Sequence, residues 1–154
     1  MPNVVSEKLR EFFREKRVEF DSNPTNWRKK KDAWLKSVRQ FYNQIQIYLN
    51  AAIKDGSVKI EYRPIQISED YVGGYQVDEL VLSVGNEKVV FTPKGMNIVG
   101  AQGRIDLRGD MKTMTIIREP AGHWSIVATR VPERTVLPLS EESLLAALKS
   151  VMRK

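Results

Sequence analysis

The residues of this chain that are best suited to binding a charged partner are basic residues in its N-terminal part. Six of them lie close together: Arg28, Lys29, Lys30, Lys31, Lys36 and Arg39. Such side chains bind phosphate groups with an affinity that falls as salt rises, so they are candidates for a nucleic-acid interface. The alternative is that they form the solvated first turns of a long helix, where lysine stems cover apolar neighbours. Four consecutive basic residues point to all sides of a helix, so the run itself makes no single stripe.

A second set of charged residues lies in the segment GRIDLRGDMK, positions 103–112. Arg104, Asp106 and Arg108 are two residues apart and therefore share one face of a predicted strand. On a concave sheet face they are candidates for binding an anion; on a solvated outer face they pair with one another. The tripeptide Arg108-Gly109-Asp110 is one that adhesion receptors recognise. A strand end followed by a turn explains it. An adhesion role would also require an extracellular protein, which the absence of cysteine and of a secretory signal does not favour, so we interpret the tripeptide as incidental.

Residues for catalysis or metal binding are scarce. The chain has no cysteine and a single histidine, His123, which excludes thiolate sites and sites with several histidines. Neighbouring strands could bring His123 near Asp106 and Asp110, but an exposed histidine explains the same pattern. The carboxylate pairs at 69–70 and 78–79 flank a loop, and solvation explains them better than acid–base catalysis. We therefore predict no catalytic residue, no metal site, no cofactor and a role other than enzymatic.

Composition and charge indicate a globular basic protein. Hydrophobic residues make up 42% of the 154 positions and charged residues 29%, which is typical of a folded domain. The net charge of +6 is uneven, because residues 1–55 carry 12 basic and 7 acidic side chains. The sequence contains no run of 18 apolar residues, so it predicts no membrane span. The absence of cysteine, and of an apolar stretch near the N-terminus typical of a secretory signal, favours the cytoplasm.

Helices are predicted at both ends of the chain. Apolar residues recur at helical spacing over residues 6–20, 24–54 and 141–152. The second helix should be long, with Pro24 at its first position and Gly56 after its end. In the third, Ser140 is the expected N-cap, and the expected buried face comprises Leu144, Leu145, Leu148, Val151 and Met152.

Between the helices the apolar period changes to two, which predicts strands over residues 57–131. Gly85-Asn86 has the composition of a two-residue hairpin turn. Pro64 suggests an edge strand or a bulge, and Pro93 to Gly95 suggests a turn into a strand containing Met96 and Ile98. The predicted fold is a single α+β domain over residues 1–154. It has two N-terminal helices, a curled antiparallel meander of six or seven strands, and a C-terminal helix packed on the sheet.

The N-terminal aromatic residues suggest contact with another molecule. The first turns of the long helix carry Trp27 and Trp34, for which the first helix is the expected intramolecular cover. If the first helix folds back as a hairpin, it covers them. If it extends away, Phe12, Phe13, Trp27 and Trp34 are candidates for self-association through an exposed apolar patch.

Three functions are therefore open from the sequence. The first hypothesis is a cytoplasmic module that binds a partner protein or forms a homodimer. The second is nucleic-acid binding by the basic helices, and the third is a small-ligand or enzymatic pocket under the curled sheet.

Overall fold

The computed structural model describes residues 4–21, 24–70, 72–96, 102–129 and 135–154. Three helices are present in it: α1 (Val4–Asp21), α2 (Pro24–Lys54) and α3 (Glu141–Val151). Each lies within a few residues of its predicted range. No helix among the described residues is long and apolar enough to cross a membrane.

The strands form one antiparallel sheet in which every strand pairs with its neighbours in sequence. Their bounds are β1 (Lys59–Glu69), β2 (Gly73–Val84), β3 (Glu87–Gly95), β4 (Arg104–Arg108), β5 (Thr113–Arg118), β6 (Trp124–Thr129) and β7 (Thr135–Pro138). The sheet is an open meander with β1 and β7 at its two edges. The predicted fold class is therefore confirmed, including the hairpin turn at Gly85-Asn86 that joins β2 to β3.

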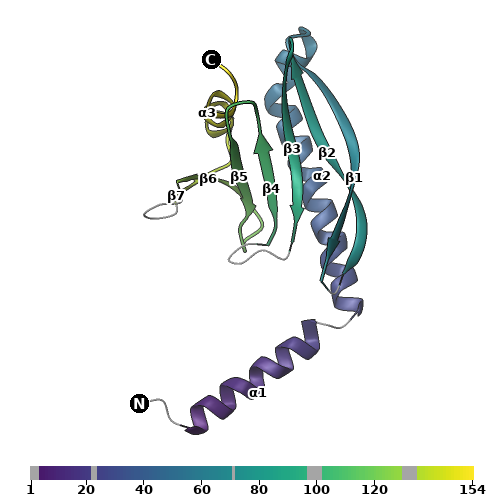
Figure 1. Cartoon of the computed structure of the whole chain (residues 1–154), viewed down its shortest axis with the longest axis vertical. Coiled ribbons are helices and arrows are strands. Elements are labelled where there is room, and N and C mark those ends of the chain that lie inside the picture. The colour runs from purple at the N-terminus through teal and green to yellow at the C-terminus, as the bar shows by residue number, and fades with distance from the viewer. Residues whose placement is uncertain (1–3, 22–23, 71, 97–101, 130–134) are drawn as a thin grey trace.

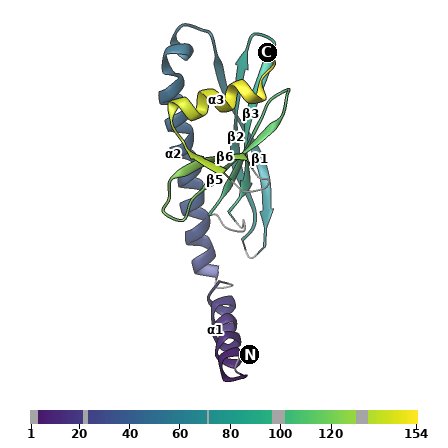
Figure 2. The same cartoon turned by 90° about the vertical axis from the view of Figure 1, so that its left-hand side faces the viewer.

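The core lies between one face of the sheet and the two helices α2 and α3, which share one side of the strands (Figures 1 and 2). Trp34, Phe41 and Ile45 of α2 are almost fully buried. The Phe41 ring packs edge-on against Phe91 of β3, with 5.7 Å between centroids, and also contacts Trp124 of β6. The aromatic stripe that predicts the long helix is thus the stripe that the sheet covers.

The edge strand β1 and its partner β2 change the face that they bury. Ile60 of β1 packs on the core, and so do Ile65 and Ile67, which is a shift of one residue in the alternation. Pro64 lies at this shift and pairs with Asp78 of β2. The Tyr42 hydroxyl of α2 donates a 2.6 Å hydrogen bond to the Asp78 carbonyl oxygen, so α2 satisfies the backbone at the irregularity. The prediction that Pro64 marks an edge strand is confirmed.

Helix α3 begins at a reciprocal cap. The Ser140 hydroxyl accepts a hydrogen bond from the Ser143 amide, and the Ser143 hydroxyl accepts one from the Ser140 amide. The predicted N-cap is confirmed. Leu144, Ala147 and Val151 form its buried face. Leu145 is 53% exposed, so its predicted place on that face is wrong.

Two strand predictions are wrong in detail. Pro93 does not end β3, which continues to Gly95 with an irregularity in its pairing to β4 between these two residues. Met96 lies just beyond β3, and Ile98 lies outside the described residues. The edge strand β7 begins at Thr135, in a segment expected to connect the sheet to the last helix. It pairs with β6 through Leu137 opposite Ile126.

Candidate interaction surfaces on α1 and α2

Helix α1 extends away from the rest of the molecule and does not fold back along α2 (Figures 1 and 2). Three large apolar side chains on it are exposed: Leu9 by 53%, Phe12 by 51% and Phe13 by 63%. The two phenylalanine rings contact each other edge-on, with centroids 5.6 Å apart. This part of α1 is therefore an exposed apolar surface, which we call the α1 patch. The alternative of a helical hairpin is not what the structure contains.

The two tryptophans expected to join this patch are buried elsewhere. Trp27 is 7% exposed and Trp34 is 1% exposed, and both belong to the core. Trp34 packs against Trp124 of β6 and fits tightly over Gly103, where a β-carbon would overlap its ring. The expectation that only α1 can cover these residues is wrong, because the far strands of the sheet reach Trp34. Of the four residues predicted for self-association, Phe12 and Phe13 are accessible.

The positive charge of the molecule is concentrated on α2. This helix has seven basic residues and one acidic residue, so its net charge of +6 equals that of the whole chain. On a helix, Arg28, Lys29, Lys36 and Arg39 share an arc of about 100°. All four are exposed, and none forms an ion pair with another described residue. Asp32 lies on the same arc. We call these four residues the basic arc.

The other two residues of the predicted basic set lie off this arc. Lys30 places its ammonium group 4.5 Å from the centre of the Trp27 ring, and Lys31 is half-buried. Both therefore cover the apolar side of the helix. The structure thus brings together four of the six predicted residues on one surface.

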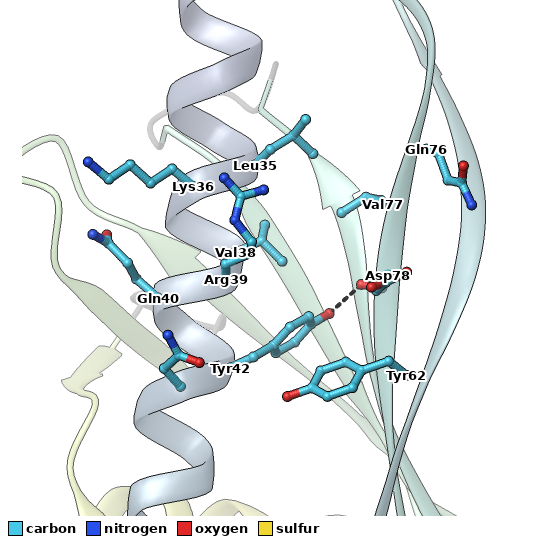
Figure 3. A pocket seen from close by; sticks show the side chains of 11 residues that line it. Leu35, Lys36, Val38, Arg39, Gln40, Tyr42, Tyr62, Gln76, Val77 and Asp78 are labelled. Carbon is cyan, nitrogen blue, oxygen red and sulfur yellow. Dashed lines mark hydrogen bonds between the residues drawn. The ribbon is translucent and has the colours of Figure 1, made fainter.

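A groove of about 610 Å³ opens between α2 and the hairpin of β1 and β2 (Figure 3). Its floor is apolar and contains Leu35, Val38 and Val77. Lys36 and Arg39, from the end of the basic arc, lie on its α2 side, while Asp78 and Tyr62 lie on its strand side. The groove therefore has Arg39 at its α2 rim and a strand side with a carboxylate and an aromatic ring, while the Lys36 side chain is directed away from the strands (Figure 3).

Tyr62 is held in this groove from one side. Its ring lies 5.6 Å from that of Tyr42, and its hydroxyl accepts a hydrogen bond from the Gln46 side-chain amide. It remains 39% exposed. Tyr42 beneath it is buried, and burial, with the nearby Asp78 and Glu79 carboxylates, raises the pKa of its hydroxyl well above the ordinary value. Tyr42 is therefore a fixed hydrogen-bond donor, whereas Tyr62 offers an accessible ring.

The alternating row of Arg104, Asp106 and Arg108 lies on the sheet face opposite the helices, because the intervening Ile105 and Leu107 belong to the core. Arg104 donates to both oxygens of Asp106, at 2.8 and 3.3 Å. This pair occupies the guanidinium group, and Arg108 is exposed at the strand end. Arg104 and Asp106 of this row therefore form an ion pair on the outer face of the sheet.

The same outer face carries a second buried carboxylate. Glu79 of β2 pairs with Arg63 of β1 at 2.6 Å and accepts a hydrogen bond from the Thr92 hydroxyl of β3 at 3.0 Å. The partners of this buried carboxylate compensate its charge.

The residues considered for metal binding are not brought together. Asp110 pairs with Arg153 after α3, at 2.9 Å, and Asp106 pairs with Arg104. His123 is exposed in the turn before β6. Within the described ranges, no group of three or more histidine, aspartate or glutamate side chains could hold a metal ion.

Sequence reasoning did not find the groove. Its strand wall depends on the alternation shift at Pro64 and Asp78, which turns Val77 toward α2. The available signal was Pro64 itself, beside the exposed aromatic residue Tyr62. No protein-family model matches this sequence, and neither a curated protein nor a solved structure is significantly similar to it.

Proposed function

We propose that this protein is a self-associating interaction module in which the α1 patches of two copies cover each other. The observation that carries this proposal is the exposure of Leu9, Phe12 and Phe13, each more than half accessible, on a helix that stands away from the core. Exposed apolar surfaces of this kind mark interfaces. Because α1 extends away from α2 and the sheet, cover for it must come from another molecule.

A second copy is the partner that the charges favour. Helix α1 has five basic and five acidic residues, so two copies of it can approach without net repulsion. The rest of the chain carries the whole net charge of +6, which opposes contacts between the remaining parts of two molecules. An arm about 27 Å long keeps those parts apart. Two-fold pairing is the commonest closed assembly.

Sedimentation equilibrium of the full chain tests this proposal. We expect a dimer for the natural sequence and a monomer for the double variant Leu9→Gln and Phe13→Gln. Glutamine is a good helix former, so this change removes apolar surface with little loss of helix propensity. The matched control is Ile47→Gln on α2, since Ile47 is 67% exposed but lies off the α1 patch.

Salt should strengthen the dimer, because ions screen the repulsion between the two basic α2 helices. A natural protein that stays monomeric at high concentration and high salt would overturn the proposal. So would a double variant that dimerises as strongly as the Ile47→Gln control.

We infer a second function, nucleic-acid binding, from the basic arc. Four exposed cations without ion pairs among the described residues lie along about 16 Å of one helix face. Such an arc fits a phosphate backbone, which it would contact without reading sequence. Asp32 within the arc opposes binding locally, and the four cations outweigh it.

Fluorescence anisotropy with a labelled oligonucleotide across a salt series tests this second function. Four contacts with a single strand predict a slope of about −2.8 for log affinity against log salt, and each lost contact should reduce its steepness by about 0.7. Lys36→Gln should show that reduction. Lys149→Gln on α3, an exposed lysine away from the arc, should leave the slope unchanged. Absence of binding at low salt would remove this function.

A cytoplasmic location and a non-enzymatic role complete the proposal. The absence of cysteine supports a reducing compartment. The interaction surfaces on α1 and α2 support the non-enzymatic role. Cell fractionation would test the location directly, and a protein recovered only outside the cytoplasm would contradict it.

A further inference from the structure

We propose that the groove between α2 and the β1–β2 hairpin receives an unstacked base of a single-stranded nucleic acid, with the base against Tyr62. This inference rests on the proposed nucleic-acid binding by the basic arc and goes beyond it in assigning a base-binding site. It therefore predicts a preference for single strands that the arc alone does not provide.

The position of the groove relative to the basic arc is the first argument. Lys36 and Arg39 belong to both. In Figure 3 the Arg39 guanidinium group lies on the face of α2 beside the groove, and the Lys36 side chain is directed away from the strands. A phosphate chain that follows the arc therefore passes along the rim of the groove. Both cations lie on the α2 side, and the Asp78 carboxylate lies on the strand side. A phosphate is repelled from the strand side. The polarity of the groove therefore places phosphates along α2 and the uncharged base toward the strands.

The chemistry of the strand wall is the second argument. Tyr62 is fixed by Tyr42 and Gln46 and still exposes 39% of its surface. An immobilised, accessible tyrosine ring is the kind of platform on which bases stack, regardless of base identity. The Asp78 carboxylate beside it can accept a hydrogen bond from a base amino group.

The size of the groove is the third argument. Its volume of about 610 Å³ lies within the range of about 300–1,000 Å³ that is usual for small-ligand sites. A base inside a duplex is stacked and paired, so its faces cannot reach a ring at the side of a groove. Only an unstacked base can enter, and recognition of such bases by aromatic side chains is characteristic of single-strand binding.

Anisotropy with the full-length protein tests the site, with labelled oligo(dT), oligo(rU) and a duplex of matched length as probes. Tyr62→Ala should weaken binding of single strands roughly 5- to 150-fold, the range of one lost base-stacking contact. Its effect on duplex binding should be small. Tyr62→Phe keeps the ring and should bind single strands nearly as the natural protein does. Circular dichroism of both variants checks that the fold is retained.

The outcomes separate this inference from the function on which it rests. If Tyr62→Ala weakens the binding of single strands and not that of the duplex, the groove is the base site. If Lys36→Gln lowers the salt slope while Tyr62→Ala changes nothing, the basic arc binds nucleic acid and the groove inference is wrong. If the natural protein binds none of the three probes at low salt, both the nucleic-acid function of the basic arc and the base site in the groove are wrong. If Tyr62→Ala reduces the affinity for oligo(dT) and for oligo(rU) equally, the site does not recognise the 2′-hydroxyl group. An unequal reduction identifies the preferred strand.

Discussion

At the scale of single residues, the Arg-Gly-Asp tripeptide has a structural role that its sequence did not reveal. The glycine lies against the end of α3, where a β-carbon on Gly109 would overlap the carbonyl group of Val151. The same turn also holds this carbonyl group, because the Met111 amide donates a hydrogen bond to it at 2.8 Å. Asp110 adds an ion pair with Arg153. The tripeptide is therefore the point at which the β4–β5 turn docks on the last helix.

This arrangement predicts different costs for neighbouring substitutions. Gly109→Ala should lower the free energy of unfolding by about 1–3 kcal/mol, because the added methyl group displaces the end of α3. Gly74→Ala is the matched control, since a β-carbon there meets its nearest atom at 3.9 Å. Asp110→Ala should cost at most about 1 kcal/mol, because its ion pair with Arg153 is half exposed. Urea unfolding measures all three, and equal midpoints for Gly109→Ala and Gly74→Ala would contradict the close contact.

At the scale of elements, the sequence predicted what depends on periodicity alone. The stripe through Trp34, Phe41 and Ile45 defines α2, and alternation with turn residues defines most of the strands. The prediction was wrong where pairing with distant residues overrides local signals. Pro93 looks like a turn residue, yet β3 continues through it because β4 pairs alongside. Strand β7 is short and lies at an edge, and it exists because β6 offers it a partner.

The candidate sites were predicted less completely than the elements. Arc membership on α2 follows from helical geometry, so Arg28, Lys29, Lys36 and Arg39 could be selected from sequence once the helix was assigned. The groove could not be predicted from the sequence. It depends on which side of α2 faces β1 and on the shift in alternation at Pro64. The direction of α1 could not be predicted either, because it depends on the connection to α2 and not on the pattern within either helix.

At the scale of the whole molecule, the α1 patch and the net charge lie on different helices. The net-neutral arm α1 carries the exposed phenylalanines, and α2 carries the whole net charge. Self-association through the α1 patch would therefore leave the basic arc on α2 accessible. A dimer joined at the α1 patches would present two basic arcs, and two linked sites on one strand raise overall affinity without new contacts.

The stability of the whole molecule should fall in alkaline solution through tyrosines that join its parts. Tyr42 ties α2 to the sheet at Asp78, and Tyr75 of β2 donates to the Glu69 carboxylate of β1. Burial is the main cause that raises the pKa of both hydroxyls above the ordinary value near 10. In the unfolded chain these groups lose their protons above about pH 10, while in the folded protein they keep them. The stabilisation is therefore complete below that pH and is lost as pH rises through the folded-state pKa.

Each such tyrosine should reduce the free energy of unfolding by about 1.4 kcal/mol per pH unit above pH 10. Tyr42→Phe should reduce this pH dependence by the contribution of one tyrosine. The variant also loses the hydrogen bond to Asp78, which costs roughly 0.5–1.5 kcal/mol at neutral pH, so the slopes and not the absolute stabilities are compared. Urea unfolding at several pH values above 10 provides them. Parallel slopes for the natural protein and Tyr42→Phe would show that Tyr42 ionises in the folded protein as readily as in the unfolded chain, contrary to its buried position between α2 and the sheet.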